Sequence, residues 1–146
     1  MNKVILCGHT GSHNRGGEAI IKSTADLFSS MGIKAVLATH DLPYDQQLGV
    51  SEFSQIVEYA EFRNHPIKRA TSLFFDKALK AQYIANSLRQ MDVWKAAQGN
   101  IALNVGGDTY CYDVMPKISI NLNKYCAEHG IPCIFWGCSI EKKKIN

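Results

Sequence analysis

Two glycine-rich segments of this 146-residue chain could do chemistry, and each follows a short apolar run. Residues 8–17 read Gly-His-Thr-Gly-Ser-His-Asn-Arg-Gly-Gly and come directly after Val4–Cys7. Residues 106–113 read Gly-Gly-Asp-Thr-Tyr-Cys-Tyr-Asp and come directly after Ile101–Val105. Glycine lets backbone N–H groups approach a ligand, and a helix that follows favours negative charge at its N-terminus. Phosphates and carboxylates are the expected ligands, although any tight turn between a strand and a helix also uses glycine.

The first loop offers an amide, a cation and an anion close together. Arg15 could hold a phosphate or carboxylate with two hydrogen bonds, or it could be a solvated surface residue. Asn14 could contact substrate or hold the turn through its own side chain, and Glu18 stabilises a helix start in either case. The candidate substrate-binding residues of this loop are Gly11, Asn14, Arg15, Gly16 and Glu18.

The second loop supplies the candidate base. Asp108 could accept a proton or bind sugar hydroxyls, and its alternative role is to cap the next helix. Tyr110 could stack on a sugar ring or pack at the edge of the core. Gly106 and Gly107 permit close approach of the backbone. We therefore expect Asp108 to be catalytic and Gly106, Gly107 and Tyr110 to bind substrate.

Several common sites are not supported. Neither loop has the Gly-x-Gly-x-x-Gly spacing of dinucleotide sites or the Gly-Lys-Ser/Thr ending of a P-loop, so no cofactor is expected. His9 and His13 have no third ligand at a metal spacing, and the five cysteines form no Cys-x-x-Cys pair, so neither a metal site nor a disulfide framework is expected. A net charge of +3 does not favour a nucleic-acid partner. No apolar run approaches the roughly 18 residues of a membrane span, and no secretory signal is seen, so a cytoplasmic location is expected.

Five short, mostly continuous apolar runs predict strands that are buried on both faces. They alternate with helical patterns, which predicts a mostly parallel, doubly wound, Rossmann-like α/β sheet forming a single domain over residues 1–146. In such a sheet the loops after the strands share one edge, and ligands bind there. The polar, proline-containing stretch 40–53 is expected to be a loop. The expected strands are Val4–Cys7, Ala35–Thr39, Ile56–Ala60, Ile101–Val105 and Cys133–Gly137.

Three helices are expected between these strands. The first follows Gly17 and ends at Gly32, a second runs from Pro66 to about Trp94, and a third begins near Pro116 and ends at Gly130. The inward stripe of the first helix is expected to consist of Ile20, Thr24, Leu27, Phe28 and Met31. The third is expected to turn Ile118, Leu122, Tyr125 and Cys126 inward.

The ordered pair of segments 8–19 and 106–113 resembles the polysaccharide pyruvyl transferases. That family typically shows a first loop ending in Asn-x-Gly-Asp-Glu-Ala and a later strand ending in Gly-Gly-Asp or Gly-Gly-Gly. Here the first loop ends Asn14-Arg15-Gly16-Gly17-Glu18-Ala19, so Gly17 stands where the family usually has aspartate. The segment Phe135–Ile140 is similar to the family's next strand and loop. The resemblance covers the N-terminal half of a family member.

The resemblance implies a glycosyltransferase-B-type architecture with the active site between two Rossmann-like halves. It implies transfer of pyruvyl from phosphoenolpyruvate to a sugar of a cell-surface polysaccharide, as in exopolysaccharide biosynthesis. This chain would then be incomplete on its own and would shape the acceptor side through Asn14, Asp108 and Tyr110. The cations that hold the donor would lie in a missing C-terminal domain.

Two other functions remain open from the residues. One is a non-catalytic sugar- or anion-binding module, which Gly17 and the short length favour. The other is a phosphate-binding protein of flavodoxin-like topology. If a partner domain is missing, an aromatic rim is expected to be exposed and a homodimer could form through it. The candidate rim residues are Tyr110, Tyr112, Trp136, Phe74 and Phe75.

Overall fold

The computed structural model of the chain is built around a parallel sheet of five strands. It describes residues 3–9, 11–58, 67, 70–71, 74, 101–107, 111 and 115–139. The strands are β1 (Lys3–Cys7), β2 (Lys34–Thr39), β3 (Gln55–Glu58), β4 (Ile101–Val105) and β5 (Cys133–Trp136). The helices are α1 (Arg15–Ser30), α2 (Leu42–Gln47), the 3-10 turn η1 (Val50–Glu52) and α5 (Met115–Glu128).

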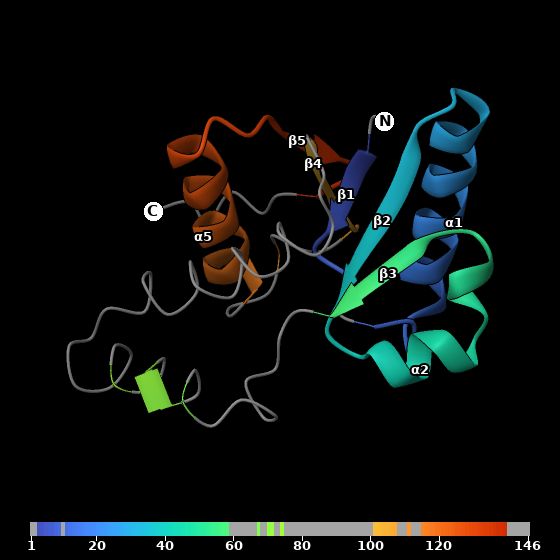
Figure 1. The fold of residues 1–146 in the computed structure, drawn as a ribbon, viewed down its shortest axis with the longest axis horizontal. Coiled ribbons are helices and arrows are strands. Elements are labelled where there is room, and N and C mark those ends of the chain that lie inside the picture. The colour runs from blue at the N-terminus through green and yellow to red at the C-terminus, as the bar shows by residue number, and fades with distance from the viewer. Residues whose placement is uncertain are drawn as a thin grey trace.

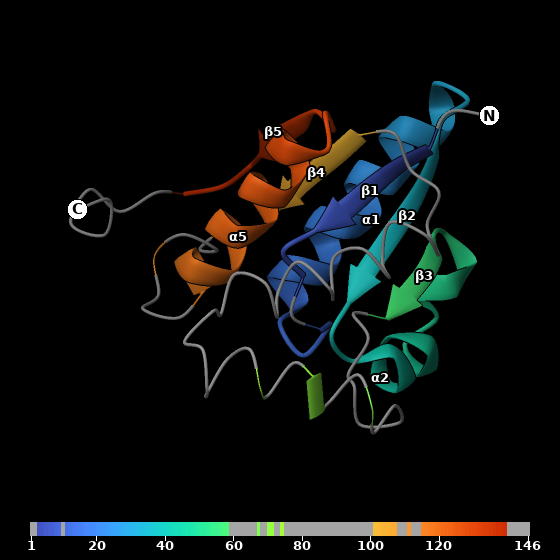
Figure 2. The same ribbon diagram turned by 60° about the vertical axis from the view of Figure 1, so that its left-hand side comes forward.

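The sheet has the strand order β3-β2-β1-β4-β5, and every neighbouring pair is parallel. The chain builds one half of the sheet outward from β1 to β3 and then returns to place β4 against the other side of β1. This reversal puts the topological switch point between β1 and β4, where Cys7 is in register with Asn104. The predicted Rossmann-like α/β fold is confirmed, and the arrows of the strands point to one common edge (Figure 2).

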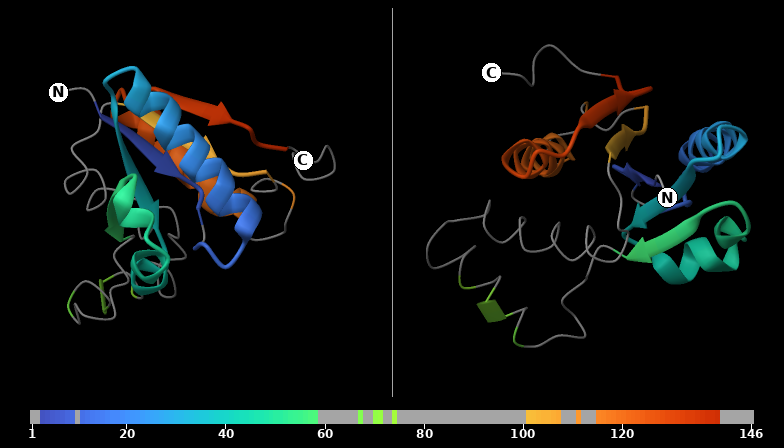
Figure 3. Two further views of the ribbon diagram at one scale, coloured as in Figure 1. Left: turned by 90° about the vertical axis from the view of Figure 1, so that its right-hand side faces the viewer. Right: turned by 45° about the horizontal axis from the view of Figure 1, so that its top comes forward.

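Two apolar layers cover the sheet, one on each face. Helix α1 and η1 cover one face, where Ile21 and Val50 pack with Leu6, Leu37 and Leu103. Helix α5 covers the other, as the end-on view makes plain (Figure 3). The continuous apolar runs of the sequence are explained by this sandwich, because neither face of the central strands meets water.

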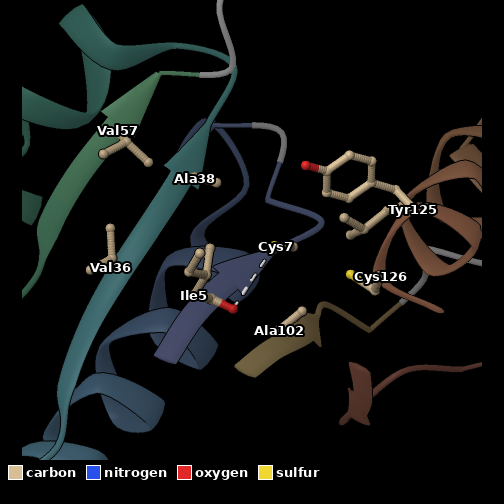
Figure 4. Close-up of a cluster of buried hydrophobic side chains, with 9 residues drawn as sticks. Ile5, Cys7, Val36, Ala38, Val57, Ala102, Tyr125 and Cys126 are labelled. Atoms are coloured by element: carbon tan, nitrogen blue, oxygen red, sulfur yellow. Dashed lines mark hydrogen bonds between the residues drawn. The ribbon is translucent and has the colours of Figure 1, made fainter. Parts of the chain in front are cut away.

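The layer beneath α5 contains residues that the sequence assigned to the core. Leu122, Tyr125 and Cys126 of α5 belong to the same buried cluster as Ile5 and Cys7 of the central strand. The close-up of the cluster shows Tyr125 and Cys126 extending from α5 (Figure 4). Gly130 ends the helix with φ of 64°, and Pro132 follows it, as expected. The side chain of Ile118 lies outside the described part.

The inward face of α1 differs from the predicted stripe. The buried residues are Ile21, Thr24 and Ala25, whereas Leu27 and Met31 are exposed. The predicted stripe is confirmed at Thr24, and Ile20 and Phe28 pack partly buried against the core, but it was wrong at Leu27 and Met31. Ile21 and Ala25 complete the buried contact line instead. The predicted end of the helix is confirmed, since Gly32 has φ of 72° and donates its N–H to Ser29.

The stretch 40–53 is not a loop, contrary to the expectation from its proline and polar residues. It contains α2 and η1. Asp41 caps α2 by accepting a hydrogen bond from the N–H of Tyr44, and Pro43 lies in the first turn, where its missing N–H has no cost. The same residues that suggested a loop are thus start signals of a short helix, which lies beside the carboxyl end of β2 (Figure 1).

Candidate ligand site at the switch point

The candidate site lies at the carboxyl edge of β1 and β4. The loop 8–17 leaves β1, and Gly106-Gly107 leave the adjacent β4. Gly106 has φ of 139°, so this turn is built for glycine. The loop after β5 joins the same group, because Ser139 donates its N–H to the carbonyl of Gly107. Within the described residues, therefore, the loop after β4 and the loop after β5 contact each other.

Asn14 is the N-cap of α1. Its Oδ1 accepts hydrogen bonds from the N–H groups of Gly16 at 2.9 Å and Gly17 at 3.4 Å. Glu18 donates its N–H to the carbonyl of Asn14. Three N–H groups of the first turn are therefore already bonded within the chain, so an anion at this helix end would have to displace the cap.

Arg15 and Glu18 bind each other. A guanidinium nitrogen of Arg15 donates to a carboxylate oxygen of Glu18 at 2.7 Å on the protein surface. This hydrogen bond, together with the charge of Glu18, raises the pKa of Arg15. The predicted cation of the loop, Arg15, and its predicted anion, Glu18, thus form an ion pair with each other in this structure.

A buried cluster of His9, Ser12 and Asp45 lies under the same loop. The N–H of Ser12 donates to Oδ1 of Asp45 at 2.8 Å. His9 Nε2 lies 3.3 Å from the hydroxyl of Ser12 and 3.5 Å from Oδ2 of Asp45. Asp45 is fully buried, and His9 is 5% exposed. The sequence singled out His9 only as a weak metal ligand and missed Asp45, because that residue was assigned to a loop.

The environment moves the pKa of both groups downward. Burial lowers the pKa of His9 below its ordinary value of 6.5, and the charge of Asp45 opposes this only in part. Burial alone would raise the pKa of Asp45, but hydrogen bonds from Thr39 and Ser12, with the charge of His9, outweigh burial and lower it. At neutral pH the pair is therefore a neutral imidazole beside a carboxylate.

The outer side of the loop is held by a second pair. Nε2 of His13 lies 2.9 Å from Oδ2 of Asp41, and the His13 ring stacks on Tyr44 with centroids 3.8 Å apart. Asp41 and Tyr44 belong to the start of α2, as Asp45 does. Helix α2 therefore holds the glycine loop through two sets of contacts. Asp45 makes the buried contacts, and Asp41 and Tyr44 make the more exposed ones.

The remaining predicted site residues have mixed outcomes. Gly11 is buried with φ of 115°, which supports a structural need for glycine. Asp108, Tyr110 and Tyr112 lie outside the described residues, as do Phe75 and most of the predicted helix from Pro66. Trp136 and Phe74 of the predicted rim are exposed, and Trp136 still donates its Nε1 hydrogen to Thr24.

The following findings concern the described residues alone. No group of three or more histidine, cysteine, aspartate or glutamate side chains among them could hold a metal ion. None of the helices in the described part is long and apolar enough to cross a membrane. None of the five cysteines forms a disulfide.

Gly16 and Gly17 respond differently to an added methyl group, which gives a test of this geometry. A Cβ at Gly17 would meet His9 Nδ1 at an ordinary 3.7 Å, whereas a Cβ at Gly16 would press on Asn14 Oδ1 at 3.2 Å. Because alanine favours helix over glycine, Gly17→Ala is expected to raise the free energy of unfolding by about 0.5–1 kcal/mol. Gly16→Ala is expected to lose most or all of that gain, since it disturbs the cap. Chemical denaturation of both variants measures the difference, and equal gains would contradict the cap geometry.

The lowered pKa of His9 predicts a loss of stability on acidification. Between the ordinary value of 6.5 and the lower folded value, the unfolded chain binds a proton that the folded chain does not. The contribution of His9 to the free energy of unfolding is therefore at its full value above pH 6.5. As the pH decreases below 6.5, the free energy of unfolding falls by at most about 1.4 kcal/mol per pH unit for this one group. The low pKa of Asp45 extends the loss to still lower pH, below its ordinary 3.8.

Denaturation curves from pH 7.5 to pH 5 measure this slope. His9→Gln is expected to reduce it, while His129→Gln, at the end of α5, is expected to leave the His9 contribution in place. An unchanged slope in the His9 variant would show that another group causes the acid sensitivity.

Comparisons with known proteins give no family for this chain. No protein-family model matches the chain, and no curated protein sequence matches it. One solved structure is "The crystal structure of predicted subunit of tRNA methyltransferase from Methanocaldococcus jannaschii DSM". Its alignment covers 99% of this chain and 72% of the chain in the solved structure. The identity is 14% and the TM-score 0.47, a likeness too low to carry an argument about function. The comparisons therefore do not give the function of this chain, and the residues of the site are the basis for inferring it.

Proposed function

We propose that this chain is a Rossmann-like sugar-binding domain of a pyruvyl-transferase-like protein, with its acceptor site at the switch point between β1 and β4. One observation carries the proposal. Two adjacent parallel strands end in glycine-rich loops at the position where the strand order reverses. Open α/β sheets bind ligands at this position, because the loops diverge there and leave a crevice.

The chemistry of the reaction comes from the resemblance. Pyruvyl from phosphoenolpyruvate would be transferred to two hydroxyls of a sugar in a cell-surface polysaccharide precursor. Such a transfer needs a base for the hydroxyls and cations for the donor. The polar groups at this edge suit the acceptor, and a second domain would supply the donor cations. Asp108 stays the proposed base of the second loop.

A non-catalytic sugar-binding module is the second candidate, and the Arg15–Glu18 pair favours it. The arginine that was expected to hold an anion is bonded to a carboxylate 2.7 Å away. Gly17 also leaves the loop without the acid that the resembling family carries there. A domain of this composition could bind a sugar without transferring anything to it.

A product assay separates the two candidates. The protein is purified from its native source and incubated with phosphoenolpyruvate and a panel of methyl hexosides and N-acetylhexosaminides. Mass spectrometry then detects any glycoside that has gained one pyruvyl ketal, and phosphate release is followed in parallel. Product formation that Asp108→Ala abolishes supports the transferase. Glycoside binding without product supports the module. The absence of both product and binding contradicts both candidates.

A further inference from the structure

Within the part of the chain that the structure describes, His9 is held by one of its two ring nitrogens. Nε2 faces Ser12 at 3.3 Å and Asp45 at 3.5 Å, so two groups of the chain converge on one atom. No residue in the described part bonds to the other nitrogen, Nδ1. A catalytic triad would use both nitrogens, one for the acid and one for the serine, so this cluster is not one. Its geometry instead leaves one nitrogen available.

The ionised neighbour decides which nitrogen carries the hydrogen. Asp45 is ionised at neutral pH, and its Oδ2 has no hydrogen-bond partner among the described residues. A carboxylate beside Nε2 stabilises the Nε2–H tautomer and would repel a lone pair there. The neutral imidazole therefore carries its lone pair on Nδ1, which can only accept a hydrogen bond.

Nδ1 faces the bare backbone of Gly17. A Cβ built there would lie 3.7 Å from Nδ1, 3.9 Å from Cε1 of the ring and 4.0 Å from Cβ of Asn14. These are ordinary contact distances, so the position next to the ring is large enough for a methyl-sized group. Gly17 is itself partly exposed, so this position lies close to the surface of the protein.

We propose that Nδ1 of His9 accepts a hydrogen bond from a hydroxyl group of a sugar that enters over Gly17, while Asp45 and Ser12 hold the ring in place. The assignment deepens the proposed function, because it names the atom that recognises the acceptor. It gives the buried cluster a role beyond stability and gives Gly17 a reason to lack a side chain.

The surrounding charges favour a hydroxyl over an anion. The groups near His9 are Asp45 of α2, Ser12 of its own loop and Glu18 of α1. Thr39 of β2 acts on His9 indirectly, because it is hydrogen-bonded to Asp45. Both ionised members of this set are negative. The nearby cation, Arg15, is paired with Glu18, and the first N–H groups of α1 are bonded to Asn14. A neutral donor fits this environment, whereas a phosphate would meet two carboxylates.

The test begins with the imidazole itself. In protein labelled with ¹⁵N-histidine, long-range proton–nitrogen correlation at pH 7.5 shows which nitrogen of His9 is protonated. The expected result is an Nε2–H tautomer in the wild type, lost in Asp45→Asn. The methyl glycosides are then titrated, with inorganic phosphate as the anionic probe. A glycoside is expected to move the Nδ1 resonance, and phosphate is expected to leave it in place.

Gly17→Ala is the decisive variant. It fills the position beside Nδ1, and its helix is expected to be more stable than that of the wild type, so lost binding would not reflect lost folding. Affinity for the glycoside is expected to fall about tenfold or more, the effect of one lost hydrogen bond. Ser29→Ala, on the exposed far end of α1, is the matched control and is expected to bind normally.

The pH profile separates recognition from a structural role. Because protonated Nδ1 cannot accept a hydrogen bond, glycoside affinity is expected to fall as His9 protonates on acidification, and His9→Gln is expected to remove that dependence. An Nδ1–H tautomer, equal affinity of Gly17→Ala and the wild type, or a response to phosphate alone overturns the assignment.

The inference and the proposed function fail in different ways. A glycoside that shifts Nδ1 of His9 without ever becoming a pyruvylated product leaves the inference standing and contradicts the transferase. A pyruvylated product formed while Nδ1 is unperturbed by the sugar contradicts the inference alone. Absence of any His9 response to the whole glycoside panel also contradicts the inference.

Discussion

Replacing Asp45 with alanine is expected to lower the free energy of unfolding by about 3 kcal/mol. The carboxylate is fully buried and accepts the N–H of Ser12 at 2.8 Å, so its removal leaves a buried donor without a partner. His9 loses its charged neighbour in the same step. Thermal or chemical denaturation measures the loss. Because Asp45 connects α2 to the glycine loop, amide exchange in the loop 8–17 is expected to increase as well.

Asp41→Ala is the matched control for this prediction. Asp41 caps the same short helix and contacts the same loop, but its side chain is partly exposed. A cap of this kind is worth about 1 kcal/mol, so the control is expected to cost about a third of the Asp45 effect. If the two variants lose equal stability, the buried cluster does not hold the loop.

Replacing Gly11 with alanine is expected to cost about 2–3 kcal/mol. Gly11 is buried with φ of 115°, a conformation that side chains disfavour. An added Cβ would also lie 3.3 Å from Cβ of Asp41 and 3.5 Å from the ring of His13. Backbone strain and crowding therefore act together at one position of the candidate site.

Gly107→Ala provides the comparison for Gly11. A Cβ at Gly107 would have no atom of the described residues within 4 Å, and its φ lies outside the disfavoured range. Alanine there is expected to change the free energy of unfolding by less than about 0.5 kcal/mol. Equal costs at the two glycines would mean that the shape of the first loop is not set by Gly11.

Much of the fold follows from simple patterns in the chain. Continuous apolar runs indicated all five strands, because both faces of the central strands are covered. The ends of β4 agree with the prediction at both residues, and those of β1 and β2 differ by one residue at the start. Gly32 and Gly130 marked helix ends correctly, since each adopts a positive φ there.

The site was harder to predict because its buried members are distant in sequence. Asp45 reaches His9 across 36 positions, and only the docking of α2 brings the two together. A proline and several polar residues concealed that helix, although Asp41 and Pro43 are regular helix-start residues. The pairing of Arg15 with Glu18 three residues later could have been inferred from spacing on a helix. The alternative that Asn14 holds the turn through its own side chain is the one seen in the structure, where it caps α1.

Amide chemical-shift mapping of the protein with methyl glycosides and, separately, with phosphoenolpyruvate shows whether a ligand binds between β1 and β4. A ligand at the switch point is expected to shift the resonances of residues 8–17 and of Gly106 and Gly107, the ends of two adjacent strands. Residues at the far edge of the sheet, such as Gly32 and Gly130, are expected not to move. Saturable shifts confined to the far edge, or no shifts with any probe, would contradict a sugar-binding site between β1 and β4.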